Sequence, residues 1–162
     1  MGYLKRVVLF LMLWVCALQA EEGAENQIRV YVDVVADLMH PGHVAFFKNA
    51  KEFGNYLIVG VHSDEDVDSY KRVPILNLEE RVALVSSCRY VDEVYVGAPL
   101  RITEEFVKKM NIDVVVHGDD FNPDTLLEWY GVPIQLGIFK TVPYTKGVST
   151  TEIIQRIKDR FK

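Results

Sequence analysis

From residue 27 onward, apolar segments of β type alternate with segments of helical spacing, and this alternation constrains the fold more than any other feature of the chain. The predicted strands are 28–35, 56–62, 91–96 and 113–116, and the predicted helices are 42–53, 78–85, 104–110 and 149–161. Thr103 is the expected cap of the third helix, and Ser149 with Glu152 is the expected capping box of the last. The strand 56–62 is continuously apolar, as expected for a parallel strand that is buried on both faces. Such alternation predicts a right-handed, doubly wound α/β domain with one parallel sheet.

The run His40-Pro41-Gly42-His43 lies between the first predicted strand and the first predicted helix. In doubly wound folds ligands bind at the carboxyl ends of the strands, where this run falls. The start of a helix also offers unpaired N–H groups and the positive end of the helix dipole. Two imidazoles there favour a phosphate-binding site for phosphoryl or nucleotidyl transfer, although two surface histidines in a turn are the plain alternative.

Composition indicates a single globular domain over residues 27–162, because 49% of the residues are hydrophobic and no linker or repeat interrupts the pattern. The formal net charge is −5, with the basic residues scattered along the chain. A sequence-independent nucleic-acid binder needs a basic stripe, so nucleic acid is excluded as an expected partner.

The first 26 residues differ from the remainder. Lys5 and Arg6 precede the apolar stretch 7–18, which Ala20 and an acidic linker follow. This order is typical of a secretory signal. Two alternatives are an uncleaved membrane anchor and a start codon that has been assigned too early. Contact with a membrane is expected only through this segment, if it is not cleaved.

Cysteine usage contradicts export. Only Cys16 and Cys88 are present, and Cys16 lies in the leader, so a processed chain could form no internal disulfide. The body is therefore typical of a reducing compartment. The compartment stays open at this stage.

Four blocks in register resemble the cytidylyltransferases, the HxGH nucleotidyltransferases that make CDP-alcohols. They are Asp37-Leu-Met-His40-Pro-Gly-His43, Glu80-Arg81, Arg89-Tyr-Val-Asp-Glu-Val94 and Gly147-Val-Ser-Thr-Thr151. The stretch 56–65, Tyr-Leu-Ile-Val-Gly-Val-His-Ser-Asp-Glu, is similar to the family's second strand and the turn after it. The resemblance covers nearly all of residues 29–160 and implies a single Rossmann-like nucleotidyltransferase domain.

The resemblance implies that a phosphorylated alcohol attacks the α-phosphorus of CTP and that pyrophosphate leaves. Catalytic roles fall on His40, His43, Lys71 and Arg89, with Arg72 a rival to Lys71. Mg²⁺ is expected to arrive with CTP, without a dedicated protein metal site, and the protein is expected to be a homodimer.

Further residues are matched to substrate or nucleotide binding. Asp37 is expected to raise the basicity of the two histidines. The alternative is that Asp37 only forms the turn. Arg81 is expected to bind phosphate, with a surface salt bridge as its alternative. The full set is Asp37, Gly42, Arg81, His117, Gly118, Asp119, Thr145, Gly147, Ser149 and Thr150.

Two departures from the family pattern bear on activity. Val34, Val35 and Ala36 occupy a turn where relatives usually have a glycine and an aromatic residue, and Tyr144 replaces an arginine that Lys140 or Lys146 could substitute. A divergent enzyme and a catalytically impaired nucleotide-binding protein are both compatible with these changes.

The acceptor predicted from the resemblance is phosphoethanolamine or phosphocholine, whose cationic head could meet Trp129, Tyr130 or Tyr144. Glycerol-3-phosphate is the first alternative acceptor. An ATP-using adenylyltransferase and an exported interaction protein that binds no nucleotide are also compatible with the sequence.

Overall fold

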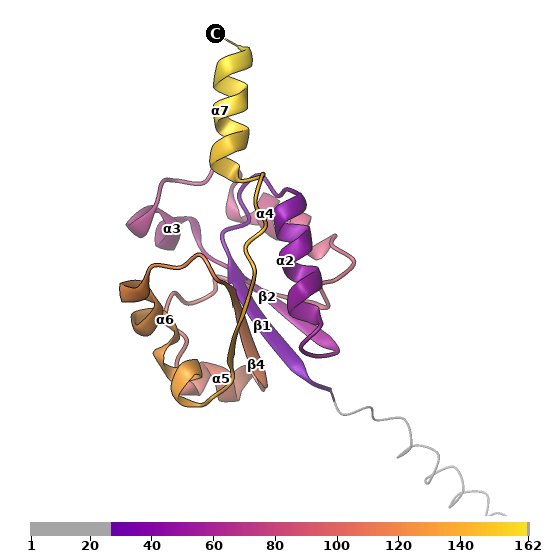
Figure 1. The fold of residues 1–162 in the computed structure, drawn as a ribbon, viewed down its shortest axis with the longest axis vertical. Coiled ribbons are helices and arrows are strands. Elements are labelled where there is room, and N and C mark those ends of the chain that lie inside the picture. Colours follow the sequence, from indigo (N-terminus) through magenta and orange to yellow (C-terminus); the bar gives the residue numbers. More distant parts are fainter. Residues whose placement is uncertain (1–26, 162) are drawn as a thin grey trace, which may run out of the picture.

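A computed structural model describes residues 27–161 and shows one five-stranded parallel sheet between helices (Figure 1). The strand order is β3-β2-β1-β4-β5, which confirms the predicted doubly wound α/β fold. The strands are β1 (Arg29–Val34), β2 (Tyr56–Val61), β3 (Glu93–Val96), β4 (Val114–Gly118) and β5 (Phe139–Val142). The predicted leader, residues 1–26, lies outside the described residues.

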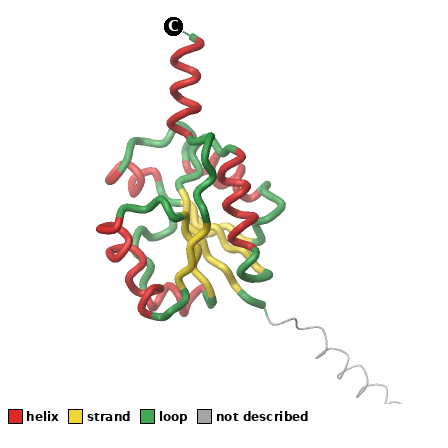
Figure 2. Tube along the Cα trace, in the orientation of Figure 1, coloured by secondary structure: helices red, strands yellow, loops and turns green. Residues whose placement is uncertain are grey.

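Helices cover both faces of the sheet, with α2 and α4 on one side and α5 and α6 on the other (Figures 1 and 2). The helices are α2 (Pro41–Lys51), α3 (Asp64–Tyr70), α4 (Leu78–Ser86), α5 (Glu104–Met110), α6 (Pro123–Gln135) and α7 (Thr150–Arg160). Within the described range, no helix is both long and apolar enough to cross a membrane.

The pleat of β1 divides its side chains between two apolar cores. Val30 and Val32 join the core beneath α2 and α4, whereas Tyr31 joins the core beneath α5 and α6. Because side chains alternate along a strand, Asp33 follows Tyr31 and faces α6, where it accepts a hydrogen bond from Tyr130. The alternation thus carries a carboxylate into the end of a hydrophobic layer.

Helix starts follow their capping residues. Thr103 and Ser149, both expected from the sequence, accept hydrogen bonds from the amides of Phe106 and Glu152. In the described part of the chain, only the Ser149 half of the predicted Ser149–Glu152 capping box is formed.

The last helix, α7, does not pack against the body of the domain. The helix extends away from the sheet (Figure 1), and none of its described residues is buried. Ile157 is 49% exposed and Phe161 is 83% exposed. The predicted helix is confirmed, but its apolar side chains are not covered by the described part of the chain, because amphipathic spacing does not specify what lies opposite an apolar face.

Three elements have no counterpart in the sequence-based prediction: α3, α6 and β5. In α6 the residues Gly131 and Pro133 interrupt the helical pattern, yet the helix continues through both. Tertiary packing of Tyr130 in the core beneath α5 and α6 stabilises this helix despite its poor local propensity.

Candidate functional site

The connection from β1 to α2 makes a tight turn around Asp37. Its two neighbours, Ala36 (φ 58°) and Leu38 (φ 49°), both adopt the left-handed conformation that L-residues rarely occupy. This turn buries Asp37 and delivers His40 to the N-cap of α2. Of the three residues that stand where relatives have a glycine and an aromatic residue, only Ala36 has a positive φ, so Val34 and Val35 carry no such strain.

The two histidines of the His40–His43 run cap α2 reciprocally. Nδ1 of His40 accepts from the amide of Gly42 (3.1 Å), and Nδ1 of His43 accepts from the amide of His40 (3.3 Å). Since each Nδ1 lone pair is occupied, the neutral rings carry their hydrogen on Nε2. A Cβ at Gly42 would lie 2.9 Å from the His40 ring, so this position needs glycine.

Both rings are held neutral. Burial, together with the nearby His40 and Lys71, lowers the pKa of His43 to about 4 against the smaller opposing effect of Asp37. Burial also lowers the pKa of His40. Asp37 raises the pKa of His43, as expected, but by less than burial lowers it, so the ring is not made more basic overall. Neutral imidazoles with Nε2–H donors suit an anionic ligand at a helix start.

Asp37 instead anchors the segment between α3 and α4. One carboxylate oxygen accepts from the amides of Ile75 (3.0 Å) and Leu76 (3.1 Å), and the other accepts from Arg72 (2.8 Å). Burial opposes ionisation, but these donors lower the pKa of Asp37. The carboxylate thus fixes the loop that carries Lys71.

This arrangement separates Lys71 from its neighbour Arg72, which pairs with Asp37. Lys71 ends α3, is exposed, and forms no ion pair within the described part of the chain. Its ammonium lies close enough to His43 to lower the pKa of that ring. Of the two candidate cations, Lys71 is the one available to a ligand.

Arg81 is a correction to the sequence analysis. Its side chain is fully buried and donates to the carbonyls of Val35 (2.6 Å), His62 (2.8 Å) and Leu76 (3.1 Å). It also pairs with Asp64 at 2.5 Å. It is neither a surface salt bridge nor a group open to a nucleotide. Arg81 joins the ends of β1 and β2 to α4.

Arg89 lies apart from the other predicted catalytic residues. It is exposed, stacks over Tyr90, and lines a groove of about 740 Å³ between α2 and α4. His40 borders that groove and also a second cavity, which Lys71 lines. Arg89 and Lys71 therefore lie in different hollows on either side of His40 at the start of α2.

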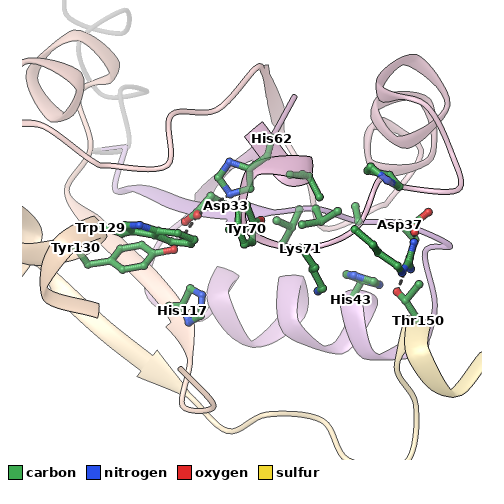
Figure 3. Close-up of a pocket in the computed structure, with 16 residues that line it drawn as sticks. Asp33, Asp37, His43, His62, Tyr70, Lys71, His117, Trp129, Tyr130 and Thr150 are labelled. Carbon is green, nitrogen blue, oxygen red and sulfur yellow. Dashed lines mark hydrogen bonds and ion pairs between the residues drawn. The ribbon is translucent and has the colours of Figure 1, made fainter. Parts of the chain in front are cut away.

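Two cavities meet in front of the start of α2. The inner cavity, of about 260 Å³, extends toward Asp33, His62, Tyr70, Trp129 and Tyr130, and the outer cavity, of about 460 Å³, extends toward the start of α7. Figure 3 shows His43 and Lys71 at one end of the inner cavity and Asp33 with Tyr130 at the other. The residues that line both are Asp33, Val34, His43, Lys71, His117 and Thr150.

The outer cavity collects most of the predicted nucleotide-binding residues: His40, Gly42, His43, His117, Gly118, Thr145, Ser149 and Thr150. Asp120 lines it in the place expected of Asp119, whose carboxylate accepts from the amide of Tyr144 (2.8 Å). Gly147 (φ 88°) forms the turn before α7 without lining the cavity. Neither Lys140 nor Lys146 lines it, so neither stands in for the expected arginine near Tyr144.

A hydrogen bond connects this cavity to the β1–α2 turn. The Thr150 hydroxyl donates to the carbonyl of Asp37 (2.6 Å), which places the first turn of α7 beside the first turn of α2. Two helix starts therefore face one space, an arrangement that favours a polyanionic ligand.

Sequence reasoning missed Asp33 and His62, which lie within apolar runs. Both are buried, and Nε2 of His62 lies 3.0 Å from Oδ2 of Asp33. The available signal was their position: each is a polar residue at the carboxyl end of an apolar parallel strand, where ligands bind.

Comparison with known proteins agrees with the geometry. A family model described as cytidylyltransferase-like matches residues 32–156. The chain is 47% identical over 139 residues to ethanolamine-phosphate cytidylyltransferase of Dictyostelium discoideum, covering 83% of this chain and 39% of that protein. It is 40% identical over 146 residues to FAD synthase of Thermococcus kodakarensis, covering 86% of this chain and 98% of that protein.

Among solved structures, the lipopolysaccharide core biosynthesis protein from Thermoplasma volcanium is similar with a TM-score of 0.60 and 28% identity. That match covers 76% of this chain and 100% of the other. By contrast, the chain spans about two fifths of the length of the Dictyostelium relative.

Proposed function

Because this chain belongs to the cytidylyltransferase-like family, we propose that it transfers CMP from CTP to phosphoethanolamine, giving CDP-ethanolamine and pyrophosphate. A phosphate oxygen of the acceptor attacks the α-phosphorus in line. The new P–O bond forms as the bond between the α-phosphorus and the bridging oxygen breaks, and that oxygen leaves with pyrophosphate.

The outer cavity supports CTP binding. Two helix starts, those of α2 and α7, offer amide donors and the positive ends of their dipoles to a triphosphate. The Nε2–H groups of His40 and His43 are donors that need no protonation at neutral pH. Such fixed donors stabilise the charge that develops on the α-phosphoryl oxygens.

The observation that carries the choice of acceptor is the inner cavity, which has groups of opposite charge at its two ends. Lys71 and His43 lie where the two cavities meet, and the Asp33 carboxylate lies at the far end beside Trp129 and Tyr130. A small molecule with a phosphate at one end and a cation at the other matches both ends. Cation–π contact with Trp129 and Tyr130 would add to the attraction.

A free oxygen on Asp33 favours a primary ammonium over a quaternary one. Oδ1 of Asp33 is buried and has no hydrogen-bond donor among the described residues. Because Oδ1 is enclosed, a ligand would reach it only after a small shift of the carboxylate; an ethanolamine head has three N–H donors that could then satisfy it, whereas a choline head has none. The ammonium therefore supplies a hydrogen bond that the described protein groups leave unmade.

Mg²⁺ is proposed as the companion of CTP. Within residues 27–161 no group of three His, Cys, Asp or Glu side chains could hold a metal ion. Of the described carboxylates, Asp33 and Asp120 are the two that line the outer cavity. Phosphate oxygens and water would therefore provide most ligands, as is usual for nucleotide-bound Mg²⁺.

The test is pyrophosphate release by the full chain with CTP, ATP, UTP or GTP against phosphoethanolamine, phosphocholine, glycerol-3-phosphate or FMN. We expect turnover with CTP and phosphoethanolamine, lost in His43→Ala and weakened at least about tenfold in Lys71→Ala. Lys108→Ala, which removes an exposed lysine paired with Glu104, is the matched control and should change nothing. CTP binding without pyrophosphate release would identify an impaired nucleotide-binding protein.

A second candidate, adenylyl transfer from ATP, is favoured by the likeness to an FAD synthase over 98% of that protein. FAD is FMN joined to an adenylyl group through a phosphoanhydride bond, so turnover with ATP and FMN in the same assay would replace the cytidylyl proposal. The inner cavity opposes this candidate, because a buried carboxylate at its end suits a cation better than a flavin.

We also propose a homodimer formed through the groove beside Arg89. Val44 and Leu84, 36% and 43% exposed, line that groove together with Tyr90. Light scattering of the purified chain tests it, and a monomer at assay concentrations would refute it.

A further inference from the structure

His62 is held on both of its ring nitrogens in the buried layer between β2 and α6. Nδ1 lies 3.0 Å from the carbonyl oxygen of Ala98, and Nε2 lies 3.0 Å from Oδ2 of Asp33. The side chains of His62 and Asp33 are 4% and 3% exposed. Figure 3 shows the ring above Asp33, at the end of the inner cavity away from His43.

The identity of these partners fixes the protons. A carbonyl oxygen only accepts, so Nδ1 of His62 carries a hydrogen. The hydrogen between Oδ2 of Asp33 and Nε2 could lie on either atom, but Oδ2 also accepts from the Tyr130 hydroxyl (2.7 Å), which favours an ionised Asp33 and a hydrogen on Nε2. The ring is therefore an imidazolium and Asp33 a carboxylate. Burial opposes both charges, but their pairing raises the pKa of His62 and lowers that of Asp33.

Groups on every adjoining element are compatible with this pair. Asp66 on α3 favours the charged ring, and His117 on β4 favours ionised Asp33. The hydroxyl of Tyr130 on α6 stays protonated, because burial and the charge of Asp33 raise its pKa. The same two causes raise the pKa of Tyr70 on α3 to about 12. From α4, Arg81 donates to the carbonyl of His62 rather than to its ring.

We propose that His62 is a positioning residue for the acceptor: it pairs with Oδ2 and keeps Asp33 ionised, so that the carboxylate remains the anionic end of the inner cavity for a small primary ammonium group. This rests on the proposed function and names what sets its acceptor selectivity. Without the imidazolium, Asp33 would be a lone buried carboxylate, which takes up a proton rather than remain charged. A protonated Asp33 would attract an ammonium only weakly.

The expected effect is confined to the cationic end of the acceptor. His62 lines the inner cavity but not the outer one, so binding of CTP should not depend on it. An acceptor without a cation, such as glycerol-3-phosphate, should be insensitive to it as well. This selectivity distinguishes positioning from a general loss of structure.

The test measures KM and kcat of the full chain for phosphoethanolamine and for CTP between pH 5.5 and 8.5, in wild type and His62→Gln. We expect the variant to raise the KM for phosphoethanolamine about tenfold at pH 6.5 and to leave the KM for CTP within about twofold. Raising the pH should ionise Asp33 in the variant and lower that KM again, a rescue that wild type does not need.

A double-mutant cycle separates positioning from folding. In an Asp33→Asn background His62→Gln should cause no further rise in the KM for phosphoethanolamine, whereas a purely structural effect would add to it. Should His62→Gln fail to fold, Tyr130→Phe removes only the second donor to Oδ2 and should shift the same KM in the same direction, by less.

The outcomes are distinct. Wild type that does not use phosphoethanolamine refutes the proposed function and this inference together. Wild type that uses it, with an unchanged pH profile in His62→Gln or with additive effects in the cycle, refutes the inference alone.

Discussion

Replacing Arg81 by methionine tests whether this residue stabilises the fold or binds the nucleotide. Arg81 is fully buried, and its guanidinium donates to three carbonyls and one carboxylate. Methionine fills similar space but donates nothing. Each buried carbonyl left without a donor costs about 1–3 kcal/mol, whereas Asp64, with its side chain 36% exposed, can be hydrated instead.

The three carbonyls together predict a loss of about 3–9 kcal/mol in the free energy of unfolding. This is a large part of the roughly 5–15 kcal/mol that stabilises a typical domain. For a domain of this size it corresponds to a fall in Tm of at least about 10 °C. Arg81→Lys should recover only part of the loss, because one ammonium cannot reach partners arranged around a planar fork.

The assay is thermal and urea unfolding, with Arg101→Met as the matched control. Arg101 pairs with Glu128 at 3.0 Å, but the two side chains are 64% and 56% exposed, so its loss should cost less than about 1 kcal/mol. Nucleotide affinity is measured on the same samples below their Tm.

A Tm of Arg81→Met within about 3 °C of that of Arg101→Met would refute this reasoning. So would a stable Arg81→Met variant that loses CTP affinity, since that result would return Arg81 to the nucleotide-binding role expected from the sequence.

Three further predictions concern the start of α2 and its neighbours. The His43 ring, with its pKa near 4, should show no NMR titration above about pH 5. In the unfolded chain the His43 ring takes up its proton near pH 6.5, so the unfolding free energy should fall as the pH drops from about 6.5 to 4. A His43 ring that titrates near pH 6.5 in the folded protein would contradict this prediction. Ala36 is buried and has a φ of 58°, a conformation that glycine adopts readily and a β-branched residue does not. In urea unfolding, Ala36→Gly should change the unfolding free energy by less than about 1 kcal/mol, whereas Ala36→Val should lower it by at least about 2 kcal/mol. Equal effects of the two variants would contradict backbone strain at this position. Thr150→Val removes the hydrogen bond to the Asp37 carbonyl and should lower the unfolding free energy by about 1 kcal/mol. The same variant should weaken CTP binding in calorimetry, whereas Thr151→Val, at an exposed position, should not change the unfolding free energy.

The fold was largely predictable because its signals are local. Apolar runs of strand length, capping residues such as Thr103 and Ser149, and helical spacing between them are written in neighbouring residues. The elements that were missed lack such signals: α6 passes through Gly131 and Pro133 because packing, not propensity, stabilises it.

The site was predictable only in part. The His40–His43 run, Lys71 and the start of α7 were found because their positions along the chain imply their positions at one edge of the sheet. Which of Lys71 and Arg72 is available depends on Asp37, whose hydrogen bonds reach residues far along the chain. The burial of Arg81 likewise depends on carbonyls from three separate segments.

The sequence by itself determined the parallel α/β architecture and the helix start at the edge of the sheet, since both follow from the period of the apolar residues and from helix capping. Only the tertiary structure decided the charge state of the site. It placed His62 against Asp33 across two strands, buried them together at the inner cavity, and left one carboxylate oxygen without a hydrogen-bond donor among the described residues. Burial and pairing set the pKa of such groups, and both depend on which distant segments pack around them.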